Sequence, residues 1–154
     1  MIEIYTDGSS KGNPGPGGYG VVMIHKDKRK ELSQGYNLTT NNRMELLAVI
    51  VGLEKLKKPQ MEVIVYSDSK YVVDSVEKKW LFGWENKNFK NKKNSDLWKR
   101  FLIAYRKHKI HFRWIKGHDR HPQNERCDRL AVQAAKGKNL IPDTFFEQIE
   151  KQNI

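Results

Sequence analysis

The stretch MIEIYTDGSSKGNPGPGGYGVVMIH, residues 1–25, decides how the fold begins. Over residues 2–7 the side chains alternate with the two-residue period of a β-strand, and Asp7 closes that pattern. Six glycines and two prolines follow within residues 8–20 and predict a broad loop. Residues 19–25 predict a second strand and residues 31–36 a third. The chain therefore begins with an antiparallel meander.

Strands and helices alternate after this meander. Residues 39–42 offer capping side chains to a helix over residues 43–57, and the apolar run EVIVYS at 62–67 predicts a central strand. A helix is expected to begin at residues 68–69 and run toward residue 79. A further helix is expected over 96–107, a strand over 110–115 and a helix over 124–136. This order predicts an α/β fold with a five-stranded mixed sheet flanked by helices, in one domain spanning residues 1–154.

Length and composition limit the class of protein. A chain of 154 residues can bury a normal core, and Cys127, its only cysteine, excludes an intramolecular disulfide. The N-terminus lacks a secretory pattern, and the longest apolar run, residues 46–53, is too short to span a bilayer. We therefore expect a monomer in the cytoplasm with no membrane partner, and Cys127 as a small core residue.

Four acidic residues stand in separate local contexts: Asp7, Glu45, Asp68 and Asp128. Two follow apolar strands and two lie on helices, so a compact fold can gather them into one cluster. Carboxylates of this kind suit Mg²⁺ or Mn²⁺, and a net charge of +11 around such a cluster points to a polyanion such as nucleic acid as the substrate. Each acid alone has a structural alternative. Asp7 can belong to a turn and Glu45 to a capping box, while Asp68 can be part of a helix N-cap and Asp128 of a surface ion pair.

Basic and aromatic residues gather between positions 78 and 100. Eight lysines or arginines stand against two acids there, which gives this segment +6 of the net charge of +11. Its tryptophans can either stack on nucleic-acid bases or brace a helix. Packing is the better explanation for Trp98, whereas both alternatives stay open for Trp80 and Trp84.

Five motifs together resemble the bacterial ribonuclease HI family: YTDGSSKGNPGPGGYG at 5–20, TTNNRMEL at 39–46, VYSDSKYV at 65–72, NSDLWKRF at 94–101 and WIKGHDRHPQNERCDRLA at 114–131. The resemblance implies a ribonuclease H-like fold and hydrolysis of the RNA strand of RNA–DNA hybrids. It also implies that Asp7, Glu45, Asp68 and Asp128 hold two Mg²⁺ ions, with Mn²⁺ as a substitute, and that the products carry 3′-hydroxyl and 5′-phosphate ends. By the same resemblance His118 assists proton movement or product release.

The resemblance also implies a set of substrate contacts. Small or amide side chains that can approach the wide minor groove of a hybrid are Gly8, Ser9, Asn13, Asn41, Asn42 and Ser69. Thr40 and Asn94 match residues that hold a phosphate of the DNA strand, and Arg43 adds charge nearby. The remaining expected contacts are Lys70 and, in a basic protrusion at residues 80–94, Trp80, Trp84, Lys87 and Lys90.

Three features depart from the family pattern. Lys70 stands where familiar members have glutamine, Leu38 replaces a frequent arginine, and the protrusion is shorter than in familiar members. Two other classes remain as alternatives: a binding module that has lost cleavage, and a resolvase-like or transposase-like nuclease of the same fold. The tail, residues 140–154, is either a short helix docked through Phe145, Phe146 and Ile149 or a frayed end.

Overall fold

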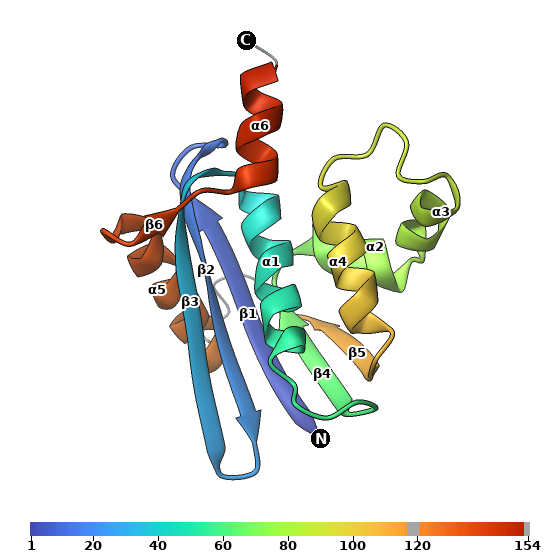
Figure 1. The fold of residues 1–154 in the computed structure, drawn as a ribbon. Coiled ribbons are helices and arrows are strands. Elements are labelled where there is room, and N and C mark those ends of the chain that lie inside the picture. The colour runs from blue at the N-terminus through green and yellow to red at the C-terminus, as the bar shows by residue number, and fades with distance from the viewer. Residues whose placement is uncertain (117–120, 153–154) are drawn as a thin grey trace.

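The computed structural model describes residues 1–116 and 121–152 and has a mixed β-sheet at its centre (Figure 1). Its strands are β1 (Ile2–Ser10), β2 (Gly15–His25), β3 (Lys28–Thr39), β4 (Glu62–Ser67), β5 (Lys109–Trp114) and β6 (Leu140–Ile141). They lie in the order β5-β4-β1-β2-β3-β6. The three-stranded meander β1–β2–β3 is antiparallel as predicted, whereas β4, β5 and β6 each pair in parallel.

Six strands rather than the five expected form this sheet in the described residues. The additional strand, β6, contributes only two residues, which pair with Gly35 and Tyr36 of β3. A strand of two residues is too short to show a period, so the sequence pattern could not indicate it.

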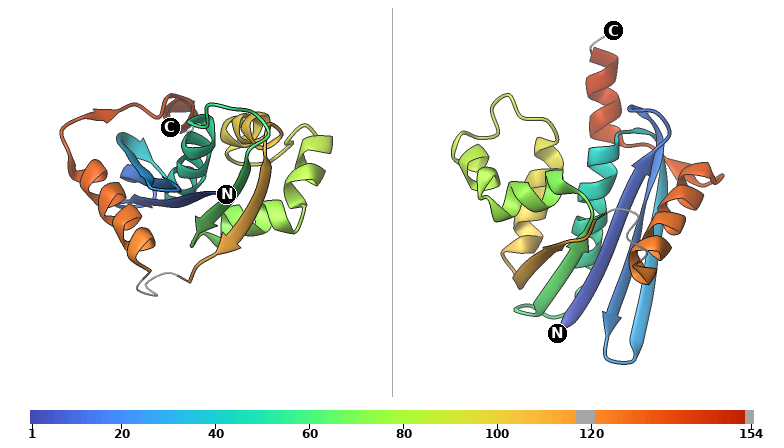
Figure 2. Two further views of the ribbon diagram at one scale, coloured as in Figure 1. Left: turned by 90° about the horizontal axis from the view of Figure 1, so that it is seen from below. Right: turned by 180° about the vertical axis from the view of Figure 1, so that it is seen from behind.

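Helices cover both faces of the sheet (Figure 2). They are α1 (Asn41–Glu54), α2 (Lys70–Glu77), α3 (Trp80–Asn86), α4 (Ser95–Tyr105), α5 (Pro122–Lys136) and α6 (Thr144–Gln152). One face carries α1, with α4 packed beside it, and the other face carries α5. No helix in residues 1–116 or 121–152 is both long and apolar enough to cross a membrane.

Alternation along the strands creates two hydrophobic clusters, one on each face. Ile4 and Val21 are fully buried in the larger cluster, beneath α1. Tyr5 and Val22 belong to the smaller cluster, together with Cys127 of α5. The prediction that Cys127 is a core residue is confirmed, and burial raises the pKa of its thiol, which keeps the sulfur protonated.

The glycine-rich segment is not the broad loop that its composition predicts. β1 continues to Ser10 and β2 begins at Gly15, so only residues 11–14 connect the two strands. The glycines instead allow α5 to approach the sheet closely: a Cβ on Gly20 would collide with the backbone oxygen of Cys127 and the side chain of Leu130 in α5. Because this requirement comes from a helix more than a hundred residues downstream, local propensity misjudges the segment.

Arg43 of α1 connects this helix to α4 and to the chain segment just before α6. Its Nε and Nη2 donate to the Asp143 carboxylate at 2.7 and 2.9 Å, and its Nη1 and Nη2 each donate to Asp96 at 2.8 Å. Thr39 Oγ1 also donates to Asp143 at 2.7 Å. Burial alone would lower the pKa of Arg43, but its hydrogen bonds to Asp96 and Asp143 raise that pKa above the ordinary value. This ion-pair network fixes the start of α6.

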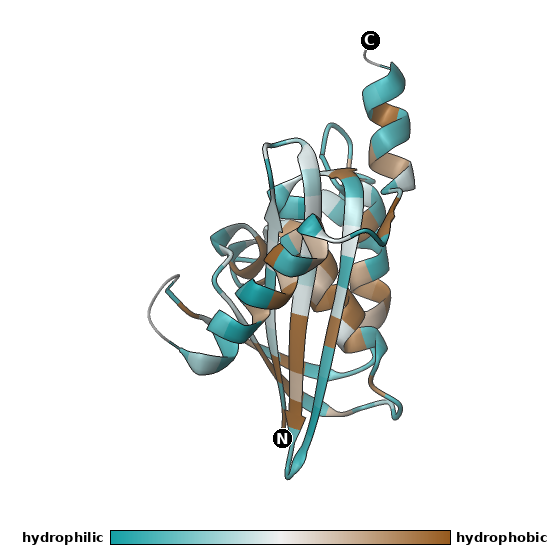
Figure 3. Cartoon of the chain, turned by 90° about the vertical axis from the view of Figure 1, so that its left-hand side faces the viewer, coloured by the Kyte–Doolittle hydropathy of each residue, from teal (hydrophilic) through white to brown (hydrophobic). Residues whose placement is uncertain are grey.

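The tail is a short helix and not a frayed end over residues 144–152, but its apolar residues dock only partly. Phe145 and Ile149 stay 39% and 38% exposed, and no residue of α6 is buried. Figure 3 shows hydrophilic residues over much of α6, which extends away from the sheet. Polar pairing at Asp143 therefore holds the start of the tail, and the Phe145 and Phe146 rings lie near the Arg43 guanidinium without being buried.

Candidate active site

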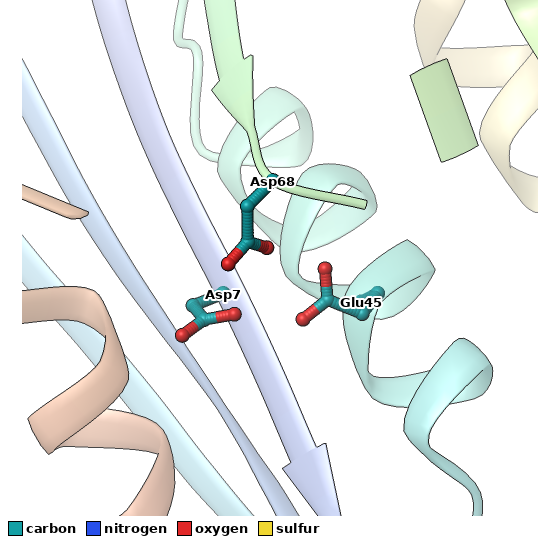
Figure 4. A group of neighbouring side chains, drawn as sticks. All are labelled: Asp7, Glu45 and Asp68. Carbon is teal, nitrogen blue, oxygen red and sulfur yellow. The ribbon is translucent and has the colours of Figure 1, made fainter. Parts of the chain in front are cut away.

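Three carboxylates from three different elements converge on one point (Figure 4). Asp7 lies on β1, Glu45 lies on α1, and Asp68 directly follows β4. One oxygen from each residue lies within 4.8 Å of an oxygen from each of the other two. The expected gathering of Asp7, Glu45 and Asp68 is thus present in the structure.

Gly8 allows β1 and α1 to approach closely enough to form this cluster. A Cβ at Gly8 would collide with the backbone of Met44 and Glu45. In its absence, the Gly8 N–H donates to Glu45 Oε1 at 2.6 Å and to Asp7 Oδ1 at 2.9 Å. A single backbone N–H therefore bridges two of the three carboxylates.

Like charges in a buried place raise the pKa values of this cluster. Burial raises the pKa of Asp7 to about 7, against opposing hydrogen bonds to Glu45 and Gly8, and the charges of Asp68 and Asp128 add to the rise. Burial and then the charge of Asp7 raise the pKa of Glu45 well above its ordinary value. Full ionisation of the cluster therefore requires compensating positive charge.

The unsatisfied oxygen of Glu45 shows where such charge fits. Glu45 is 4% exposed, and its Oε2 is buried without a hydrogen-bond partner among the residues that the structure describes. A buried carboxylate oxygen with no donor is costly, and a cation would satisfy it. An all-oxygen ligand set is the kind that Mg²⁺ and Mn²⁺ prefer, so these residues fit a divalent metal ion.

Asp128 approaches the cluster from the other face of the sheet. It lies on α5, is exposed, and lines the same open hollow of about 400 Å³. This acidic hollow is bounded by Asp7, Gly8, Asn41, Asn42, Glu45, Asp68, Ser69, Lys70, Tyr71 and Asp128. Asp128 is outside the tight group of three, so the structure brings all four acids to one hollow but only three into mutual ligand distance.

The stability of the metal-free protein should fall as pH rises. The Asp7 carboxyl titrates near 3.8 in the unfolded chain and near 7 in the folded protein, so the folded state holds more protons between these values. The free energy of unfolding should therefore decrease from about pH 4 to about pH 7, by on the order of 1–4 kcal/mol. Urea unfolding in EDTA at several pH values measures this slope. Asp7→Asn should flatten it, and an equally steep slope in that variant would assign the titration to other groups.

Several expected substrate residues lie around the acidic hollow. Asn41 and Asn42 are exposed at the start of α1, and Ser69 caps α2, its Oγ accepting from the Val72 N–H at 3.2 Å. Ser9 lies on β1, opposite Gly18. Tyr71 also lines the hollow and was missed, because a tyrosine inside an apolar helix pattern gives no sign of function.

A second hollow, of about 370 Å³, holds the residues expected to grip a phosphate. This tail hollow is lined by Asn13, Pro14, Thr40, Asn42, Arg43, Lys93, Asn94, Phe145, Phe146, Ile149 and Glu150. Thr40 is also the N-cap of α1, its Oγ1 accepting from the Arg43 N–H at 3.2 Å. Asn13 Oδ1 accepts from the Asn41 N–H, and Asn94 Nδ2 donates to the Tyr71 hydroxyl at 3.0 Å.

The expectation that Arg43 contacts the substrate needs correction. Its guanidinium is 2% exposed, and each of its five N–H groups is directed at Asp96, Asp143 or Asn94. No donor is left for a phosphate. The sequence could not reveal this, because one of the two carboxylates that bind Arg43 lies a hundred residues away.

The basic protrusion has a third hollow, of about 300 Å³. Its lining residues are Trp80, Gly83, Trp84, Lys87, Lys90 and Lys92. Trp80 is 48% exposed there, whereas Trp84 is partly buried against Trp98, with ring centroids 5.9 Å apart. Trp98 is fully buried and donates to the Tyr71 hydroxyl at 2.8 Å, which confirms its predicted packing role. His118 lies outside the described residues.

The family model described as RNase H matches residues 1–136. A ribonuclease H from Desulforamulus reducens is 58% identical over 147 residues, covering 92% of each chain.

Solved structures with similar folds are also known. LC9-RNase H1, described as a type 1 RNase H with the type 2 active-site motif, superposes with a TM-score of 0.80 at 33% identity, covering 89% of this chain and 72% of that one. LC11-RNase H1 in complex with an RNA/DNA hybrid gives a TM-score of 0.71 at 29% identity, covering 88% of this chain and 97% of that one. The predicted fold class is thereby confirmed.

Proposed function

This chain belongs to the ribonuclease H family, and we propose that it cuts the RNA strand of RNA–DNA hybrids by two-metal-ion hydrolysis, leaving 3′-hydroxyl and 5′-phosphate ends. The observation that carries the proposal is the convergence of Asp7, Glu45 and Asp68, with the unsatisfied Oε2 of Glu45 among them. Action as a single-domain monomer in the cytoplasm is part of the same proposal.

The carboxylates would hold Mg²⁺, with Mn²⁺ as a substitute. Asp7, Glu45 and Asp68 form the centre of this ligand set, and Asp128 adds a fourth carboxylate from α5. When bound, the two ions supply the positive charge that activates a water molecule and offsets charge on the leaving 3′ oxygen. The protein's own contribution is to hold its carboxylates close together, through the Gly8 N–H and the close approach of β1 and α1. His118 would assist proton movement or product release.

Recognition of the hybrid would use the exposed amides at the rim of the acidic hollow. Asn41 and Asn42 are exposed there, and side chains of this size can reach the wide minor groove where 2′-hydroxyls stand. Gly8, Ser9, Asn13 and Ser69 would line the same path, with Thr40 and Asn94 at a phosphate of the DNA strand. LC11-RNase H1, solved with an RNA/DNA hybrid, supports this substrate class.

A cleavage assay with four matched substrates tests the proposal: RNA–DNA hybrid, duplex RNA, duplex DNA and single-stranded RNA, each with Mg²⁺ and with EDTA. We expect cleavage of the RNA strand of the hybrid alone, and only with Mg²⁺, because B-form DNA offers no 2′-hydroxyl to read. End-labelling then identifies the 3′-hydroxyl and 5′-phosphate. Comparable cutting of duplex DNA would instead favour the resolvase-like alternative.

Lysines of the protrusion should supply affinity without chemistry. Lys87, Lys90, Lys92 and Lys93 are exposed, and Lys92 Nζ lies 5.0 Å from the centroid of the Trp84 ring. Neutralising all four should weaken hybrid binding and flatten its salt dependence by up to roughly one log–log unit per lost phosphate contact, while kcat stays nearly unchanged. Binding titrations across a salt series measure this slope. An unchanged slope would identify these lysines as ordinary solvated surface.

A further inference from the structure

Lys70 and Trp114 form a cation–π pair at the rim of the acidic hollow. Lys70 is the first residue of α2 and lines the hollow, and its Nζ lies 4.6 Å from the centroid of the Trp114 ring. Trp114 is the last residue of β5 and is 42% exposed. An exposed tryptophan at the end of an edge strand contributes little to the core, so packing alone does not explain its place.

The ends of two parallel strands bring this pair together. Trp114 lies opposite Ser67 at the end of β4, so it is next to the point where the chain leaves β4 through Asp68. Trp114 Nε1 donates to the Asp68 backbone oxygen at 3.2 Å. A single indole thus contacts both a residue of the carboxylate cluster and the ammonium two residues later.

The ammonium of Lys70 lies against the indole ring and forms no ion pair with a carboxylate of the described residues. This holds although Asp7, Glu45 and Asp68 line the same hollow. A lysine reaching into the cluster would neutralise the ligands that a metal ion needs. Held on the Trp114 ring, the ammonium stays at the rim as a positive charge with donors available to an anion.

We propose that Trp114 is a positioning residue that holds Lys70 at the rim of the acidic hollow, where the ammonium binds a phosphate of the cleaved strand beside the scissile one. This inference rests on the proposed function, because it requires a nucleic-acid strand in the hollow. It assigns a role to Trp114, for which the sequence motifs predicted none, and it explains how the lysine at position 70 would contribute to binding.

A double-mutant cycle on the full-length protein tests the proposal, with KM and kcat for an RNA–DNA hybrid measured at saturating Mg²⁺. Lys70→Gln should raise KM by about three- to tenfold with kcat within about twofold, and should reduce the salt slope of KM by up to about one unit. Trp114→Leu should raise KM by a similar factor in the parent but by less than about twofold in the Lys70→Gln background, because residues acting through one contact are not additive. Trp114→Phe, which keeps a ring, should recover part of the affinity lost in Trp114→Leu.

Matched controls separate this effect from loss of fold and from failure of the proposed function. Lys58→Gln removes one exposed lysine beyond the far end of α1 and should leave KM near the parent value. Urea unfolding of Trp114→Leu checks the fold. If the parent cleaves the hybrid but the two KM effects multiply in the double variant, Trp114 does not act through Lys70 and the inference is overturned. A parent that fails to cleave any hybrid overturns the proposed function itself.

Discussion

Asp7→Asn is expected to lower kcat/KM for the hybrid by about a thousandfold or more while the protein stays folded. Asparagine keeps the shape of the side chain but removes the charge that would hold a metal ion next to Glu45 and Asp68. In EDTA the variant should be at least as stable as the parent, because one member of a mutually repelling cluster becomes neutral. The loss of activity would then come from the site and not from the fold.

Three measurements separate the loss of catalysis in Asp7→Asn from a loss of fold. Single-turnover cleavage gives the rate, thermal unfolding in EDTA gives the stability, and thermal unfolding with Mg²⁺ gives the stabilisation due to metal binding. The parent should gain stability with Mg²⁺, and Asp7→Asn should lose most of that gain. Asp74→Asn is a suitable control, since Asp74 pairs with Lys78 on α2 and does not line the acidic hollow. Near-normal cleavage by Asp7→Asn would remove this residue from the catalytic assignment.

The extent to which sequence predicts this site depends on how local each cause is. Local patterns predict Asp7 and Asp68 at the ends of two strands and Glu45 shortly after helix-capping residues. Asp68 does follow β4 directly, whereas Asp7 lies inside β1. The oxygens of these three residues lie within 4.8 Å of one another only because Gly8 has no Cβ to keep β1 and α1 apart. No local sequence pattern indicates this close approach. A glycine after a strand is usually a turn signal, and here the strand continues through it to Ser10.

Arg43 shows the limit of reading charge from sequence. A basic residue beside two asparagines resembles a phosphate contact, and only the fold reveals Asp96 and Asp143 around its guanidinium. Trp114 is a second example: an aromatic residue at the end of a strand resembles ordinary packing, and only the fold reveals Lys70 against its ring. In both cases the partner decides the role, and that partner is distant in the sequence.

Gly8→Ala should damage both stability and activity, although it adds a single methyl group. The added Cβ would meet backbone atoms of Met44 and Glu45, which cannot swing aside as a flexible side chain can. Strand β1 must then separate from α1, which should cost roughly 1–3 kcal/mol of stability, as overpacking of a core does. The same displacement separates Asp7 from Glu45 and breaks the N–H bridge to both carboxylates, so cleavage should fall about a hundredfold or more.

Comparing the loss of stability with the loss of cleavage in Gly8→Ala shows whether the two effects have one cause. Gly137→Ala provides the control, because a Cβ at Gly137 would make only ordinary contacts at 3.5 Å and that residue lies at the end of α5, away from the acidic hollow. Urea unfolding and cleavage at saturating hybrid, both measured at a temperature where each variant is folded, separate stability from turnover. A Gly8→Ala protein that loses stability but cleaves at the parent rate would show that the carboxylates tolerate a wider spacing. Normal stability with lost cleavage would instead place the movement in the Glu45 side chain alone, since the backbone would have accommodated the methyl group without strain.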